Sequence, residues 1–119
     1  MKILLVKPGK HPEVKDIPGD LRSMQELVGG LIQAIYPFPE SVALICNDEG
    51  KLIDLPMNRA VPEIRDVIFG DFFLCGAPSN SSEFTSLTDD QIAQFEDRFH
   101  CPEAFLPLED DVMLTVRIP

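Results

Sequence analysis

The sequence has 119 residues, of which 45% are hydrophobic and 25% charged. This length and composition are typical of one globular domain and exclude a mainly disordered or fibrous chain. The longest apolar runs, such as residues 3–6, are far shorter than the roughly 18 residues that a membrane-spanning helix needs. Twenty acidic against ten basic residues give a net charge of −10, which disfavours direct binding to nucleic acid or to an anionic membrane.

The first part of the chain is predicted to form a β-hairpin and a short helix. The apolar run over residues 2–7 is typical of a buried strand, and residues 13–17 are its predicted hairpin partner. Asp20 is a suitable N-cap residue, and the glycine pair at 29–30 suits a helix C-terminus. Between them, apolar residues stand at helical spacing: Leu21, Met24, Leu27 and Val28.

The middle of the chain is predicted to be rich in strands, over residues 31–36, 42–46, 51–55 and 67–75. A proline-marked turn at 37–39 and the Asn47–Gly50 turn separate the first three. Within the last one, Gly70-Asp71 indicates a bulge or a bend.

The last third is predicted to contain a capped helix and a terminal strand. Thr88 with Gln91 has the spacing of a capping box, and Pro102 ends the helix predicted over residues 88–100. Over residues 112–118, apolar residues alternate with others, which indicates a half-buried strand. Such a strand either completes its own sheet or pairs across a two-fold axis, so a homodimer is left open.

Together these elements predict one α+β domain over residues 1–119. We expect a mainly antiparallel sheet of five to six strands with both helices packed on one face.

The cysteines and the first residues predict a cytoplasmic location. Cys46, Cys75 and Cys101 form an odd set without CxxC spacing, a pattern typical of reduced thiols rather than of a disulfide framework. The apolar stretch over residues 3–6 is too short for the hydrophobic region of a signal peptide.

The sequence carries no recognisable catalytic or cofactor motif. The GxSxG, GxxxxGK[ST] and GxGxxG patterns are all missing, and the two histidines, His11 and His100, are far apart along the chain. We therefore expect no catalytic residue, no metal and no cofactor.

One cationic segment is a candidate ligand site. Asn58-Arg59 follows a Leu-Pro-Met segment, and an arginine on a turn beside an amide side chain can grip a carboxylate or phosphate in a bidentate manner. With Lys51, and with Tyr36 or a phenylalanine as a wall, these residues would bind a small anion. The alternative is that they form a structural ion pair or a turn.

The negative charge lies mainly in residues 71–119, which hold ten acidic and two basic residues. This half either solubilises the protein or forms an acidic docking face. The candidate docking residues are Asp89, Asp90, Glu96, Asp97, Glu109, Asp110 and Asp111. Neighbouring carboxylates such as these diverge, so we do not interpret them as a general acid and base.

Several strings of the sequence stand in a characteristic order and spacing. They are residues 8–10 (PGK), 28–30 (VGG), 46–51 (CNDEGK), 55–59 (LPMNR), 66–70 and 84–88. In these strings the sequence resembles the bacterial and phage domain family of unknown function numbered 3846, up to about residue 99. The resemblance implies an origin in intestinal bacteria, phages or conjugative elements, sometimes beside antirestriction genes. It supplies no catalytic residue.

The leading functional hypothesis is a small, non-enzymatic cytosolic binding protein of mobile-element origin, which docks on a partner protein with a basic surface. One alternative is a nucleic-acid mimic that inhibits a host defence or restriction enzyme. Another is a small-anion-binding domain or enzyme that uses Asn58 and Arg59.

Overall fold

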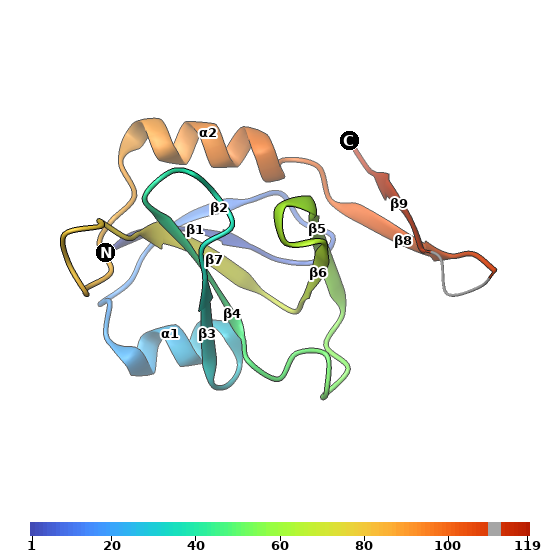
Figure 1. Ribbon diagram of the computed structural model, residues 1–119, viewed down its shortest axis with the longest axis horizontal. Coiled ribbons are helices and arrows are strands. Elements are labelled where there is room, and N and C mark those ends of the chain that lie inside the picture. The colour runs from blue at the N-terminus through green and yellow to red at the C-terminus, as the bar shows by residue number, and fades with distance from the viewer. Residues whose placement is uncertain (110–112) are drawn as a thin grey trace.

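A computed structural model describes residues 1–109 and 113–119 (Figure 1). Within this part of the chain there are two α-helices, α1 (Leu21–Val28) and α2 (Asp89–Phe99), and one 3-10 helix, η1 (Pro62–Ile64). The strands are β1 (Lys2–Val6), β2 (Glu13–Asp16), β3 (Ile32–Ile35), β4 (Val42–Asn47), β5 (Met57–Val61), β6 (Asp66–Phe69), β7 (Phe72–Gly76), β8 (Glu103–Pro107) and β9 (Met113–Arg117).

The main sheet has five strands in the order β2-β1-β7-β4-β3, and every neighbouring pair is antiparallel. Its central strand β7 is buried at every position, as is β4 beside it. The predicted α+β class and the mainly antiparallel sheet are therefore confirmed.

The two helices lie on opposite faces of this sheet, so the prediction that both pack on one face was wrong (Figure 1). On one face, Leu4 and Val6 pack with Phe95 and Phe99 of α2. On the other, Ile3 and Leu5 pack with Met24 and Val28 of α1. The reason is that successive residues of a strand point to opposite faces. An unbroken apolar run therefore needs cover on both sides.

The helix α1 begins and ends at its predicted caps, and α2 begins at its predicted capping box. The Asp20 carboxylate accepts a hydrogen bond from the Ser23 amide at 3.0 Å, and Gly29 ends α1 in the left-handed conformation with φ 76°. Thr88 and Gln91 exchange the two hydrogen bonds of a capping box, at 3.0 and 3.1 Å. These local interactions explain why the helix ends were readable from sequence.

Two predicted strands in the middle of the chain are corrected. Residues 51–54 form turns, with Leu52 and Ile53 exposed, and the strand comes later, as β5. The bend predicted at Gly70-Asp71 within residues 67–75 is confirmed, with φ +85° at Gly70, but the segment forms two strands instead of one. A side chain at Gly70 would also meet Leu55 at 2.6 Å. The bend divides the segment into β6, which pairs with β5, and β7, which enters the main sheet.

The C-terminal strand forms, but not in the predicted environment. β9 pairs with β8, a strand that the sequence did not reveal, and every residue of β9 is exposed instead of half-buried. The first predicted residue, Val112, lies outside the described residues. Figure 1 shows this β8–β9 hairpin leading away from the C-terminal end of α2. Over the described residues, neither helix is long and apolar enough to cross a membrane.

The opposite placement of the helices predicts additive effects of two core substitutions. We expect Met24→Ala to destabilise the protein by about 2–5 kcal/mol and Phe95→Leu by about 1–3 kcal/mol. Because the sheet separates the two side chains, the double variant should lose the sum of both within about 0.5 kcal/mol. Urea unfolding of the four proteins measures these energies, and a clearly larger coupling would contradict the opposite placement.

Candidate functional site

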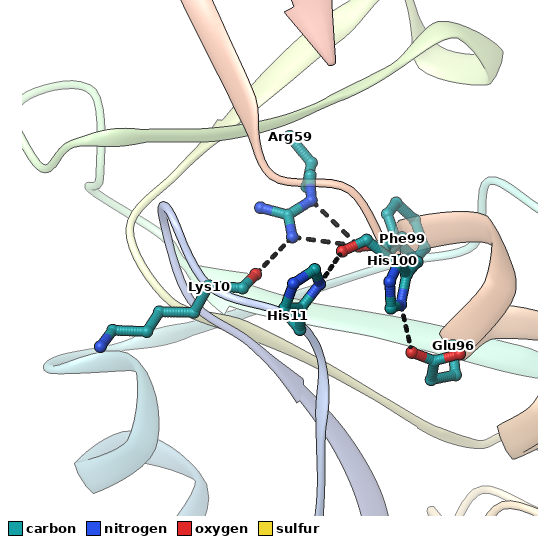
Figure 2. Close-up of polar contacts among 6 residues, drawn as sticks. All are labelled: Lys10, His11, Arg59, Glu96, Phe99 and His100. Atoms are coloured by element: carbon teal, nitrogen blue, oxygen red, sulfur yellow. Dashed lines mark hydrogen bonds and ion pairs between the residues drawn. The ribbon is translucent and has the colours of Figure 1, made fainter. Parts of the chain in front are cut away.

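Arg59 lies in β5 with its side chain fully buried, not on a turn as predicted. Its Nη2 donates to the carbonyls of Lys10 and Phe99 at 2.6 and 3.0 Å, and its Nε also points to Phe99 O at 3.3 Å (Figure 2). Its Nη1 donates to the side-chain oxygen of Asn58 at 2.9 Å. Every nitrogen of the guanidinium group therefore donates a hydrogen bond to an acceptor within this chain.

Asn58, the neighbour of Arg59, is equally buried and joins three segments of backbone. Its Nδ2 donates to the carbonyls of Val6 and Gly70, both at 2.9 Å, while its Oδ1 accepts from Arg59. The pair thus connects β5 to the end of β1 and to the bend between β6 and β7. Through Arg59 it also reaches the end of α2.

The buried guanidinium is compensated mainly by carbonyl dipoles. Burial lowers the pKa of Arg59, while the negative charge of Glu103 acts in the opposite direction. Phe99 is the last residue of α2, and the carbonyl end of a helix favours positive charge. Arg59 therefore stabilises the fold at this junction, and its donors are not presented to an external anion.

Lys51 lies apart from this pair. It forms an ion pair with Asp66 and lines a cavity of about 330 Å³ together with Cys46, Asn47 and residues of β6. Neither Asn58 nor Arg59 lines that cavity, and Tyr36 lines a different one. The structure therefore does not bring the predicted anion-binding residues together.

Asn47 is a buried polar residue that the sequence reasoning did not single out. Its Nδ2 donates to Val28 O at 3.0 Å, and its Oδ1 accepts from the Glu49 amide at 2.8 Å. A side chain at Gly30 would meet Asn47 at 2.9 Å, which explains the second glycine after α1. The strings at 28–30 and 46–51 therefore form one packed corner.

The two histidines stack on each other although they are far apart in the sequence. The ring centroids of His11 and His100 are 4.3 Å apart with an interplanar angle of 30°. His11 Nδ1 lies 2.7 Å from His100 O, and His100 Nδ1 lies 2.7 Å from Glu96 Oε1 (Figure 2). Among the described residues, no group of three or more histidine, cysteine or acidic side chains is placed to hold a metal ion.

The cysteines are free thiols. Burial raises the pKa of Cys46 to about 11 and that of Cys75 to about 12. Both side chains are therefore neutral thiols at pH 7 and poor nucleophiles. Cys101 is partly exposed at the end of α2.

The structure gathers four of the predicted acidic residues on the outer side of α2. Asp89, Asp90 and Asp97 are exposed and Glu96 is partly exposed, whereas Phe95 and Phe99 on the other side are buried. We call this set of four the acidic face. Glu109 is not on α2 but follows β8, while Asp110 and Asp111 lie outside the described residues.

Within the described part of the chain, one cation contacts the acidic face: Lys2 Nζ lies 3.8 Å from Asp89. The His100 ring contacts Glu96. Arg98, the basic residue of α2, is turned away from this face. It donates to both carboxylate oxygens of Glu63 at 2.7 Å and packs over the rings of Phe38 and Phe99. The face therefore keeps most of its negative charge.

We expect Arg59→Lys to lower the free energy of unfolding by about 2–4 kcal/mol. An ammonium group cannot match the planar fork that bonds Lys10 O, Phe99 O and Asn58 Oδ1, so buried acceptors lose their partners. Arg22→Lys is the matched control, because the Arg22 side chain is 88% exposed, and it should change stability by less than about 0.5 kcal/mol. Equal stability of the two variants in urea would contradict the structural role.

The ion pair between Glu63 and Arg98 should make stability depend on pH. The hydrogen bond from Arg98 is the main reason that the pKa of Glu63 lies below its ordinary 4.5. A lowered carboxyl pKa stabilises the fold above the unfolded-state pKa, and this contribution is lost as pH falls through the folded-state pKa. Wild type should therefore melt above Glu63→Gln at pH 7, and the difference should shrink below about pH 4.5. A constant difference between pH 7 and pH 3 would contradict this assignment.

Comparison with known proteins identifies the family. The family model described as Domain of unknown function (DUF3846) matches residues 1–100, which run from β1 through α2. No curated protein and no solved structure matches the chain. The matched region contains the buried Asn58–Arg59 pair and both helices, and the β8–β9 hairpin follows it. Because the match covers most of the sequence, this chain belongs to the DUF3846 family.

Proposed function

We propose that this protein is a small non-enzymatic binding protein of the cytoplasm, which docks the acidic face of α2 on a partner protein with a basic surface. The observation that carries the proposal is the one-sided exposure of Asp89, Asp90, Glu96 and Asp97 on a rigid, capped helix. An origin in a phage or another mobile element is supported by the resemblance to a bacterial and phage domain family, which is carried by the strings at 8–10, 28–30, 46–51 and 55–59.

The electrostatics of α2 support docking rather than catalysis. The face carries little compensating positive charge, and the whole chain carries −10. Such a field raises the rate of encounter with a positively charged partner and disfavours acidic ones. Capping by Thr88 and packing of Phe95 hold the helix in place. Association therefore costs little ordering of the backbone.

The charge density of the acidic face favours docking on a protein over mimicry of a nucleic acid. Residues 89 and 97 are eight positions apart, or about 12 Å along a helix, and the acidic face places four carboxylates over that length. Duplex DNA presents about one charge per 1.7 Å of its axis, roughly seven over the same distance.

The small-anion alternative has less support, because internal carbonyls already occupy the donors of Arg59.

A neutralised variant tests the proposed docking. We expect a protein with Asp89→Asn, Asp90→Asn, Glu96→Gln and Asp97→Asn to bind its basic partner about tenfold more weakly or worse. The matched control removes the same charge from exposed loop residues, as Asp48→Asn, Glu49→Gln, Asp54→Asn and Glu83→Gln. Tagged wild type and both variants are used for affinity capture from bacterial lysate at low and high salt, with mass spectrometry as readout.

Three results would contradict the proposal: undiminished capture by the neutralised variant, equal loss in the control, or no salt-sensitive basic protein captured by wild type. Removing two carboxylates from the first turn of α2 costs helix stability of about 0.3–1 kcal/mol each. Thermal melts of all three proteins therefore accompany the binding data, so that unfolding is not mistaken for lost docking.

A further inference from the structure

The β8–β9 hairpin leaves one strand edge and one apolar face uncovered. β8 lies beside β5, where Glu103 Oε1 accepts a hydrogen bond from the Ala60 amide at 3.0 Å. Within the described residues β9 pairs with β8 alone, and all five of its residues are exposed. A two-stranded ribbon of this kind is only marginally stable by itself. The free edge therefore offers unsatisfied backbone groups to another strand.

The register identifies which backbone groups form that edge. The Ile118 amide donates to Pro102 O at 2.7 Å, so the amide of residue 118 points towards β8. Amides alternate in direction along a strand of an antiparallel pair. The amides and carbonyls of Met113, Thr115 and Arg117 therefore point away from β8, along the free edge.

We propose that β9 pairs in antiparallel fashion with β9 of a second copy, across a two-fold axis at Thr115. In this register Thr115 faces Thr115 of the second copy. Met113 of each copy faces Arg117 of the other. Every backbone group that points outwards then finds a partner, because facing residues in such a pair exchange both hydrogen bonds. The result is a four-stranded sheet, closed by symmetry to a dimer.

The side chains of β9 suit this self-pairing. Its single charge, Arg117, lies opposite the apolar Met113 and not opposite a second arginine, and facing threonines are a favourable cross-strand pair. On the apolar face of the hairpin, Leu114 comes next to Val116 of the second copy, and both side chains are 40–45% exposed in the single chain. In this register no like charges face each other, and apolar surface is covered.

The antiparallel orientation limits the charge repulsion between two copies. Glu109 follows β8, beyond the last pair of the ladder, Pro107 and Met113. Antiparallel pairing of the two β9 strands places the two Met113 residues, and with them Glu109 of each copy, towards opposite ends of the joint sheet. Because each copy carries −10, salt should strengthen the dimer by screening the remaining repulsion. Because each copy contributes one strand of five residues to the pairing, we expect an interface smaller than that of a standard stable complex and therefore a reversible dimer.

Two backbone variants test the edge itself. Thr115→Pro removes an outward amide but no hydrogen bond of the β8–β9 ladder, and proline is tolerated at such edge positions. We expect sedimentation velocity to show a concentration-dependent dimer for wild type, strengthened by salt. The dimer should be about tenfold weaker or worse in Thr115→Pro and much less affected in Thr115→Val, which loses the facing hydroxyls but keeps the amide.

A charge-pair experiment tests the register and does not depend on proline. Thr115→Lys and Thr115→Glu each place like charges together at the two-fold axis, so each protein alone should be monomeric, whereas their equimolar mixture should dimerise. Circular dichroism and thermal melts establish that every variant is folded. A wild type that stays monomeric at the highest soluble concentration would overturn the proposal. So would open-ended assembly, a dimer unaffected by Thr115→Pro, or a mixture no more associated than its components.

Discussion

The fold depends on a buried cation that is held by main-chain carbonyls. Arg59 and Asn58 together bond to Val6, Lys10, Gly70 and Phe99, which lie at the ends of separate segments. Removing a guanidinium from water is costly, and the cost is offset only while every donor keeps a geometrically suitable acceptor. The position of α2 relative to β1 and β5 is therefore specified by polar geometry as well as by apolar packing. The same junction therefore sets the orientation of the acidic face.

The family-like strings have a structural explanation of the same kind. Val6, just before the string at 8–10, bonds to Asn58 in the string at 55–59, and Val28 bonds to Asn47 in the string at 46–51. These residues hold corners of the fold in place. The exposed residues of α2 and of the β8–β9 hairpin lie outside those strings. Similarity in the strings thus reports the fold, and it does not extend to the exposed residues of α2 and of the hairpin.

Local interactions were readable from the sequence, whereas distant ones were not. The caps of both helices involve residues only a few positions apart, and both were predicted. Arg59 reaches acceptors 49 and 40 positions away, and the histidines stack across 89 positions, so no spacing pattern marks either contact. A signal for helices on both faces was present, since residues 3–6 and 42–46 are unbroken apolar runs. The exposure of β9 carried no such signal, because its alternation resembles that of a half-buried strand.

The strand order has a consequence for the order in which the protein can fold during synthesis. β7 is the central strand and joins β1 to β4, so the β1–β2 and β3–β4 hairpins have no direct ladder between them. A nascent chain that has not yet exposed Phe72–Gly76 outside the ribosome holds two separate hairpins with uncovered apolar faces. Closure of the sheet waits for β7, and burial of Arg59 waits longer still, for Phe99. The N-terminal half is therefore the part of this molecule that most needs protection from aggregation while translation continues.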